Sequence, residues 1–587
     1  MLKALEQHVK REEYRLALAD IEKVRKKKMH IDERLRIEVL ESRCWTGLGE
    51  FSKAFTIAQE VVDKGTRFQE YTAHVIKGLL EMASAAWGLG ISDEILVACE
   101  QAERMRKGLQ AEEQSTKDSI RAEILYHESL GWYLKDDVHK GIDCARESLS
   151  IRERLGDTEG VVSSLMRVGY LNLEVDPSRT LEYEEKALEL NRQLGRKGHI
   201  IQSLLHRGLI ESWEGNWVKA EQLLLQSIGL IREHDMGYWL LPCLGILGVL
   251  YGRMGDFQRS EEFYQECLTL AERVSAGLYI AICSMNLSEI HRTRGDLEEA
   301  LKGYERAMNI NKRVGRTKGY LTGLANCGLV QYARGQIDEA LTLLEESLAL
   351  AEKQKQAGLL GGYIISYDLL FIISILIDKG MISDAQQCLD QIRLVSEESK
   401  DDYDNQVYRI AKALVLKSSM LTRNKAKAKE ILTKIVDGDF HHNELSVLAL
   451  LHLTELMVNE LQMTGDPDAL SNLRSCLAKL LEMAAKQGST LLLVETHLLQ
   501  SKVALLNLEA ERASLLLDEA QSLADQKGLT EISKRIVAEQ EALANELSVL
   551  EELSGDETLM AKRAEKTRIH EHIGEMIQQG LWRKMLF

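Results

Sequence analysis

The sequence predicts an all-α solenoid of about thirteen antiparallel helical hairpins, and three observations lead to this fold class. Proline occurs 3 times in 587 residues, whereas average usage of about 5% would give roughly 29. Hydrophobic residues make up 45% of the chain and aromatic residues 5%, which disfavours an all-β fold and indicates long, uninterrupted helices. The third observation is a pattern that recurs every 40 residues in the middle of the chain.

The repeat is clearest in four segments that align without gaps. They are EGNWVKAEQLLLQSI, MGDFQRSEEFYQECL, RGDLEEALKGYERAM and RGQIDEALTLLEESL, with glycines at Gly215, Gly255, Gly295 and Gly335. Five residues after each glycine comes a small residue, and four residues further on comes a bulky one: Leu224, Tyr264, Tyr304 or Leu344. The pattern predicts that the glycine takes the turn after a first helix. The small residue then lets the second helix pack closely, and the bulky residue fills the groove.

The same spacing extends to both ends of the chain. The small-residue position falls at Ala17, Ala54, Ile95, Gly141, Thr180, Ala220, Ser260, Ala300, Ala340, Ala385, Ala428, Leu470 and Ala513. Ile95 and Leu470 depart from the preference for a small side chain. Because each hairpin buries its apolar face only against its neighbours, thirteen hairpins predict one quasi-linear solenoid rather than several globular domains.

We expect three regions along this solenoid. Residues 1–380 form regular hairpins, most regular at 160–350, and residues 381–553 continue them with looser spacing and a capping helix over 530–547. Residues 554–587 form a basic amphipathic tail, in which Leu559, Ile569, Ile573, Met576, Ile577 and Leu581 recur at roughly helical spacing, and Gly580 can end the helix. The apolar residues Trp582, Leu586 and Phe587 follow. The tail either caps the last hairpins, occupies an acidic surface of the protein itself or of a partner, or is a disordered end.

These residues resemble the tetratricopeptide repeat family, whose 34-residue unit has a Gly turn, a small residue opening the second helix and an aromatic residue four positions later. The longer period, and links such as RERLGDTEG at 152–160, are similar to the variant in kinesin light chains, in the Leu-Gly-Asn-repeat polarity adaptors and in sensor arms of bacterial signalling ATPases. The chain departs from the shorter pattern because it lacks the Pro that ends each second helix. The resemblance implies a right-handed superhelix whose first helices line a concave, peptide-binding groove.

In that register, the groove residues expected to contact a partner are Gln202, His206, Trp213, Arg253, Asn286, Glu289, Asn326, Tyr367 and Phe371. Asn286 and Asn326 occupy equivalent positions and resemble the asparagine ladder with which long-period adaptors hold a peptide backbone. The alternative is structural, since each asparagine can bond to the adjacent repeat. Trp213 can equally fill the core between repeats, and His206 and Glu289 can be solvated or internally bonded.

Catalytic and metal sites find little support in the sequence. There is no G-x-x-x-x-G-K-[ST] motif after a strand, so a P-loop nucleotide site is not expected. His441 and His442 are adjacent, and His570 and His572 lie two residues apart, so neither pair shares one helical face. We therefore predict no catalytic residues, no metal site and no cofactor.

Charge and cysteine usage bear on partners and location. The formal net charge of −17 disfavours nucleic acid and anionic membranes as general partners. The nine cysteines are dispersed without a C-x-x-C pair, which suggests reduced thiols in the cytoplasm. The stretch at 359–377 is long and apolar enough to be considered for a membrane span, but the repeat register makes it an inner helix, so no span is expected.

The function predicted from the sequence is a non-catalytic cytoplasmic scaffold that binds a protein or peptide in its concave groove. An alternative is a ligand-sensing regulatory arm that controls a separate ATPase, kinase or transcription factor. A hydrolase would need a catalytic set that the sequence does not show.

Overall fold

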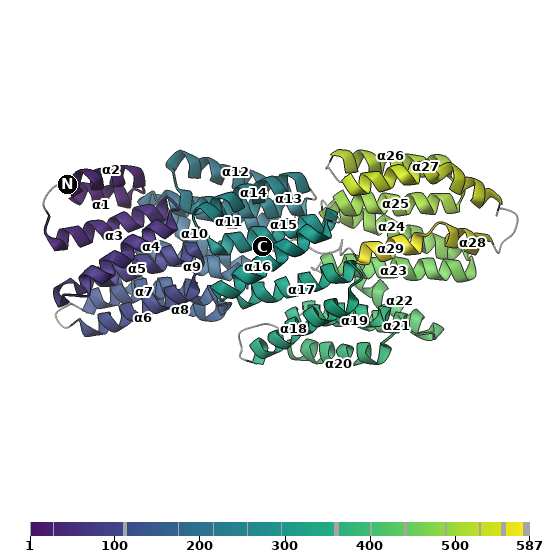
Figure 1. Cartoon of the computed structure of the whole chain (residues 1–587), viewed down its shortest axis with the longest axis horizontal. Helices are drawn as coiled ribbons and strands as arrows, with labels where there is room; N and C mark the ends of the chain where they lie inside the picture. Colours follow the sequence, from purple (N-terminus) through teal and green to yellow (C-terminus); the bar gives the residue numbers. More distant parts are fainter. Residues whose placement is uncertain are drawn as a thin grey trace.

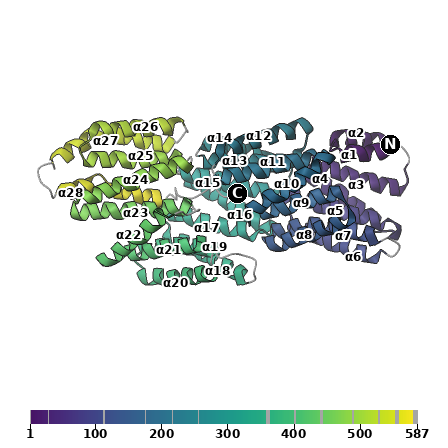
Figure 2. The same ribbon diagram turned by 180° about the vertical axis from the view of Figure 1, so that it is seen from behind.

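The described part of the chain folds into successive helices, as the composition predicts. The computed structural model describes residues 2–26, 29–109, 114–173, 175–214, 216–254, 256–294, 296–356, 363–399, 402–438, 443–487, 490–526, 530–552 and 559–578. Helices make up 89% of the described residues, which contain 29 α-helices and no strand. The molecule is elongated, with α1–α6 at one end and α22–α29 at the other (Figures 1 and 2).

Twenty-six of these helices pair into thirteen antiparallel hairpins, which confirms the predicted right-handed solenoid. The first helices are α1 (Leu2–Lys10), α3 (Ile31–Gly47), α5 (Thr72–Leu89), α7 (Gln114–Leu134), α9 (Thr158–Asn172), α11 (Lys197–Trp213), α13 (Leu240–Arg253), α15 (Gly277–Arg294), α17 (Thr317–Ala333), α19 (Tyr363–Asp378), α21 (Asp402–Lys417), α23 (Asn443–Thr464) and α25 (Thr490–Leu506). The second helices are α2 (Tyr14–Arg25), α4 (Phe51–Gly65), α6 (Ser92–Gly108), α8 (Val138–Leu155), α10 (Pro177–Leu194), α12 (Trp217–His234), α14 (Phe257–Arg273), α16 (Leu297–Val314), α18 (Ile337–Gln356), α20 (Ile382–Ser399), α22 (Thr422–Val436), α24 (Pro467–Gln487) and α26 (Ala510–Gln526). Two 3₁₀ turns, η1 (Gln69–Tyr71) and η2 (Gly237–Trp239), precede α5 and α13.

Close packing inside each hairpin follows from the small and bulky residues of the repeat. All thirteen residues at the small-residue position are buried, including Ile95 and Leu470. The bulky residue four positions later fits a notch on the first helix. A Cβ at Gly248 would lie 2.6 Å from the Tyr264 ring, and one at Gly208 would lie 2.8 Å from Leu224. Small side chains on both helices therefore set the close approach. Of the four predicted turn glycines, Gly335 has a left-handed φ of 77°, and the other three lie outside the described residues.

The solenoid coils tightly enough for one superhelical turn to rest on the next. The turns inside the early hairpins contact the links between later ones, 182 to 186 residues further along the chain. Between four and five hairpins therefore complete a turn. Gly237 meets Leu48 so closely that a Cβ there would lie 2.2 Å from the Leu48 carbonyl oxygen. Only glycine permits this backbone approach.

Carboxylates from the first superhelical turn cap helices of the second. Glu12 Oε2 accepts hydrogen bonds from the backbone amides of Lys197 at 2.8 Å and Gly198 at 3.1 Å, at the start of α11. Asp136 Oδ2 accepts one from the amide of Lys318 at 2.7 Å, at the start of α17. The N-cap residues of both helices are arginines that supply no capping side chain. Each helix start is thus satisfied by a carboxylate from a distant hairpin.

Aromatic side chains fill the inner face of the middle hairpins. The Tyr170 ring centroid lies 6.1 Å from that of Trp87 and 5.3 Å from that of Tyr133, and His206 stacks on Tyr170 at 5.5 Å. These residues come from α5, α7, α9 and α11, all first helices. Tyr238 of η2 packs against the same core. The inner face of these hairpins is a packed core.

The apolar stretch at 359–377 contributes an inner helix, as the register predicts. Its residues from Tyr363 onward form α19, which packs against α18, α20 and α21. Among the described residues, no helix combines the length and the apolar character needed to cross a bilayer. Asp368, the charged residue within this stretch, is fully buried.

The C-terminal residues cover the last hairpins. The predicted capping helix is present as α27 (Thr530–Glu552), which packs on α25 and α26. Two short helices follow, α28 (Leu559–Lys566) and α29 (Ile569–Gln578). The boundary expected between 380 and 381 falls in the turn between α19 and α20, and the three regions stay a prediction.

Removing the Glu12 carboxylate should loosen the contact between superhelical turns. Glu12→Ala leaves the amides of Lys197 and Gly198 without their capping acceptor, a loss of about 1 kcal/mol. Hydrogen exchange of these two amides should quicken, while the exposed Glu22→Ala on α2 leaves them unchanged. Equal exchange in both variants would contradict the capping role of Glu12.

Asp368 should make stability depend on pH. Burial raises the pKa of this carboxyl from 3.8 to about 7, a rise that the nearby Ser347 hydroxyl partly offsets. Since the folded chain holds the proton more tightly, the contribution of Asp368 to stability is fully present below about pH 4 and is lost as pH rises to about 7, by up to roughly 4 kcal/mol. Asp368→Asn removes this loss and should raise the melting temperature more at pH 8 than at pH 5. The exposed Asp390→Asn serves as control, and an equal rise at both pH values would contradict the assignment.

Candidate binding groove

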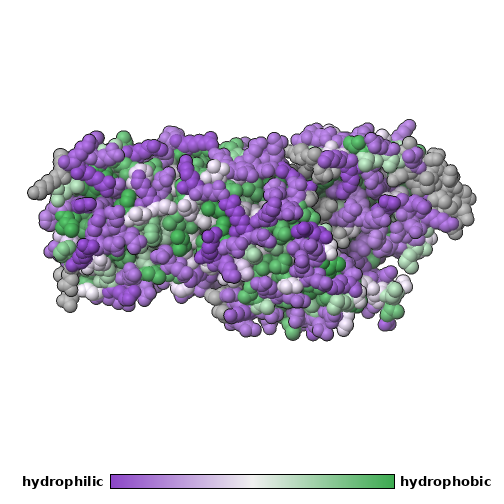
Figure 3. All heavy atoms as spheres, viewed as in Figure 1, coloured by the Kyte–Doolittle hydropathy of each residue, from purple (hydrophilic) through white to green (hydrophobic). Residues whose placement is uncertain are grey.

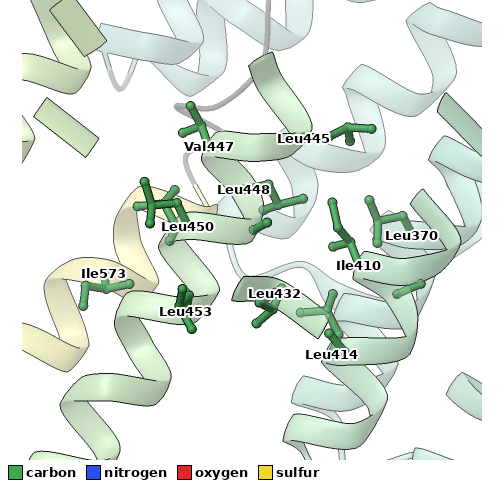
Figure 4. Close-up of a cluster of buried hydrophobic side chains, with 14 of the residues drawn as sticks. Leu370, Ile410, Leu414, Leu432, Leu445, Val447, Leu448, Leu450, Leu453 and Ile573 are labelled. Atoms are coloured by element: carbon green, nitrogen blue, oxygen red, sulfur yellow. The ribbon is translucent and has the colours of Figure 1, made fainter. Parts of the chain in front are cut away.

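The inner helices of the last two hairpins hold a helical segment of the chain itself. Helices α28 and α29 pack against the first helices α23 and α25. Ile569, Ile573 and Met576 are buried there, and their spacing of four and three residues places them on one face of α29. Figure 4 shows Ile573 beside Leu450 and Leu453 of α23. This seat, formed by α23, α25 and the start of α27, is called the tail groove below.

A buried carboxylate anchors the docked helix. Glu495 of α25 is 0% exposed at its side chain and accepts a hydrogen bond from His572 Nε2 at 2.6 Å. Arg535 of α27 donates a second hydrogen bond to the same carboxylate. Burial alone would raise the pKa of Glu495, but His572 and Arg535 hold it below its ordinary value. The tail groove thus contains an ionised carboxylate that requires a donor from the docked segment.

A second charged network lines the groove on α21 and α23. Lys417 donates a hydrogen bond to Glu455, and His452 Nδ1 lies 3.3 Å from the same carboxylate. Burial, followed by the Lys417 charge, lowers the pKa of His452 to about 4. Although burial opposes it, the Lys417 charge holds the pKa of Glu455 well below its usual range. From the tail, His570 Nε2 approaches Glu455 at 3.9 Å.

Two hydrogen bonds to main-chain carbonyls also hold the tail in the tail groove. Gln462 Nε2 of α23 donates to the carbonyl oxygen of Ala564 at 3.3 Å, and Arg563 of α28 donates to that of Leu506 at 2.9 Å. These bonds fix the position of α28 along the groove. Side-chain to main-chain bonds of this kind do not depend on which residue supplies the carbonyl.

The tail differs in one respect from the sequence prediction. Its apolar face at Ile569, Ile573 and Met576 is confirmed, but the tail forms two helices rather than one. Arg568 adopts a left-handed φ of 51°, which ends α28 and turns the chain before α29. The remaining apolar residues Leu581, Trp582, Leu586 and Phe587 lie outside the described residues.

The predicted groove residues lie on α11, α13, α15, α17 and α19, whereas the docked helices pack on α23 and α25. Asn286 and Asn326 are both buried. Asn286 Nδ2 donates to the Ile282 carbonyl oxygen at 3.0 Å, and Asn326 Nδ2 approaches Met285 Sδ at 3.4 Å. Contacts inside the solenoid therefore engage both amides, and their role toward a partner stays a prediction.

The other predicted residues divide between buried networks and half-buried positions. His206 is buried and pairs with Glu184, whereas Glu289 pairs with Arg292 and accepts a hydrogen bond from the Tyr304 hydroxyl at 2.5 Å. Those at least partly exposed are Gln202, Arg253, Tyr367 and Phe371. Tyr367 and Phe371 form an edge-to-face pair at 4.8 Å on α19. The side chain of Trp213 lies outside the described part.

Sequence analysis missed the charged residues of the tail groove. Glu495 stands within the largely apolar run TLLLVETHLLQSKVALL, and a charged residue in such a run is the signal that marks the groove. His570 and His572 were considered only as metal ligands. The described residues contain no group of three potential ligands that could hold a metal, and the structure instead places His572 against Glu495. His441 and His442 lie outside the described residues.

A family model for the tetratricopeptide repeat matches residues 199–273 and 280–353. These two matches correspond to the sixth to ninth hairpins, α11 to α18. These four hairpins carry tetratricopeptide repeats. No curated protein matches the sequence.

Several solved structures are similar to this chain at low identity. A Rap protein complexed with competence and sporulation factor has 14% identity and a TM-score of 0.44, over 60% of this chain and 98% of that one. The apo form of the quorum sensor NprR from B. thuringiensis has 12% identity and a TM-score of 0.29, over 78% and 99%. A signal transduction ATPase with a tetratricopeptide repeat sensor from Pyrococcus horikoshii has 15% identity and a TM-score of 0.35, over 53% and 50%. The tetratricopeptide assignment rests on the family match and on the hairpins themselves.

His572 and His570, both on α29, allow a matched test of whether Glu495 anchors the docked helix. His572→Ala should weaken docking of α29 by about 2 kcal/mol, because the buried Glu495 loses a charge-assisted hydrogen bond. Amide exchange in α29 should then rise by about thirtyfold. His570→Ala should have little effect, because that side chain is 49% exposed and only approaches Glu455. Similar exchange in the two variants would refute Glu495 as the anchor of the tail.

Proposed function

We propose that this protein is a non-catalytic interaction scaffold that holds a helical segment of a partner protein in the tail groove. The observation that carries the proposal is the docked pair α28 and α29, which occupies the inner surface of α23 and α25 as a bound peptide would. The tetratricopeptide hairpins supply the concave wall, and the buried Glu495 supplies a polar contact that fixes the register. The same proposal places the protein in the cytoplasm.

The contacts of the tail define the partner segment that fits. It is a helix with large aliphatic residues at positions i, i+4 and i+7, matching Ile569, Ile573 and Met576. A donor at position i+3, matching His572, meets Glu495. Each aliphatic side chain contributes about 1.5–3 kcal/mol on burial, and the donor prevents a buried carboxylate from being left unpaired. Apolar contacts supply most of the affinity, and Glu495 supplies selectivity.

The tail itself would compete with any such partner. Six residues join Glu552 to Leu559, so the tail acts at an effective concentration of about millimolar. A partner therefore binds only when its affinity, concentration or contacts elsewhere overcome this competition. The half-buried residues Tyr367 and Phe371 on α19, together with Gln202 and Arg253, belong to the proposal as further contacts along the inner face.

Releasing the tail should expose the groove to a peptide added in trans. In the full-length variant carrying Ile573→Asp and Met576→Asp, two buried apolar contacts become buried carboxylates, which favours an undocked tail. A labelled peptide of residues 559–578 should bind this variant at least about tenfold more tightly than the native chain, measured by fluorescence anisotropy.

The exposed Arg568→Asp provides the matched control, because it adds a carboxylate to the tail outside the buried face. It should bind the peptide as weakly as the native chain does. Equal binding to the released variant and to this control, or no binding to either, would refute the tail groove as a helix-binding site.

A further inference from the structure

An apolar ridge follows the turns of three successive hairpins on the edge of the solenoid. It consists of Met381, Ile382, Met420, Leu421 and Met463, whose exposed fractions range from 37% to 96%. Met381 and Ile382 lie at the turn between α19 and α20, Met420 and Leu421 at the turn between α21 and α22, and Met463 at the end of α23. In the space-filling view, apolar atoms reach the surface over the region of α18 to α22 (Figure 3). This set is called the apolar ridge below.

The corresponding turns of the early hairpins are covered. There, Leu48, Gly49 and Glu12 rest against the links of the next superhelical turn. By contrast, the side chain of Met420 in the later turn is 96% exposed, counted over the described residues. The apolar ridge thus occupies an edge that the fold uses as an interface elsewhere, and it presents large apolar side chains to solvent at a free-energy cost.

On this edge, the residue before the second helix is a large apolar one in two hairpins, whereas some other hairpins have an aspartate at the same position. Asp256 is the N-cap of α14 and accepts a hydrogen bond from the Arg259 amide, and Asp137, the N-cap of α8, accepts one from the Lys140 amide. Leu421 is the N-cap of α22 and has no capping side chain, and Met381 precedes α20. Replacing a capping residue by an apolar one costs about 1 kcal/mol, so these residues do not serve the stability of the isolated hairpin.

Unpaired cations flank the apolar ridge on α22. This helix holds five basic residues and one acidic residue, in a protein of net charge −17. Lys429 pairs with Glu460 and Lys434 with Glu430. Arg423, Lys425 and Lys427, by contrast, form no ion pair with any described residue. Their positions near the helix start oppose the helix dipole, whereas α16, α18, α20, α24 and α26 each carry an acidic residue in the first turn.

We propose that the apolar ridge and the cations of α22 form a docking surface for an acidic, apolar helical segment of a partner protein. Apolar side chains of the segment cover Met420 and Leu421, and its carboxylates pair with Arg423 and Lys427. Neighbouring helices lie about 10 Å apart, so three hairpins span roughly 20 Å, the length of about 14 helical residues. This surface lies on the edge of the solenoid and is independent of the tail groove.

The test uses three synthetic 14-residue helical peptides with one shared Leu and Phe face. Their solvent-facing positions carry Glu in the first peptide, Gln in the second and Lys in the third. Full-length protein should bind the Glu peptide about tenfold more tightly than the Gln peptide and more tightly still than the Lys peptide, and the difference should shrink as salt rises. Equal affinity for the Glu and Lys peptides would overturn the proposal.

Two variants locate the binding on the surface. Arg423→Glu with Lys427→Glu should abolish the preference for the Glu peptide. Met420→Ser with Leu421→Ser should lower the affinity for all three peptides by about tenfold. The control is Arg512→Glu with Leu515→Ser, a cation and an exposed leucine on α26, which should change nothing. Loss of binding in the control and not in the two variants would overturn the proposal.

Other occupants give distinct outcomes. Stronger binding to phosphatidylserine vesicles than to the Glu peptide, lost in Arg423→Glu with Lys427→Glu, would replace the partner helix with an anionic membrane and overturn the proposal. So would a concentration-dependent dimer that Met420→Ser with Leu421→Ser abolishes, because it would assign the ridge to a second copy. The proposal is supported if the protein is monomeric, binds the Glu peptide and does not bind the vesicles.

Discussion

Each helical hairpin of this protein leaves an apolar face that only the next hairpin can bury, and the rest of the structure depends on this constraint. It forces the thirteen hairpins into a single row, because no hairpin is stable alone. Close helix packing, set by buried small residues such as Ala220 and by notches such as Gly248, curves that row. The curvature brings Glu12 onto the start of α11 and closes one superhelical turn on the next. At the thirteenth hairpin, α27 and the helices α28 and α29 take the place of a neighbouring hairpin.

The same constraint separates two kinds of inner surface. Where consecutive superhelical turns meet, the inner helices face one another and aromatic residues such as Tyr170 and Tyr238 fill the space. Near the C-terminal end, the inner helices α23 and α25 face α28 and α29. A row of hairpins thus becomes a packed core over part of its length and a groove that accepts a helix over another part. The helix-holding groove lies at the C-terminal end of the row of hairpins.

Buried charges in this solenoid differ in whether a partner reaches them. Glu495 is fully buried and ionised because His572 and Arg535 supply hydrogen bonds. Asp368 is equally buried on α19, no described residue forms an ion pair with it, and burial raises its pKa to about 7. A charged residue in an apolar inner helix therefore indicates a special position, but its neighbours decide whether it anchors a segment or lowers the stability of the fold. Those neighbours come from elements up to 77 residues away in the chain.

The sequence by itself determined the fold class, the thirteen hairpins, the capping helix and the apolar face of the tail. These features depend on local periodicity, which the order of residues expresses directly. Only the tertiary structure decided how many hairpins complete a turn, which inner residues are buried and where the tail docks. His206 and Asn286 illustrate the reason, since both occupy the inner helical face that the sequence predicts, yet both are buried and bonded inside the solenoid. Small rotations between hairpins accumulate along the row, and no single repeat specifies their sum.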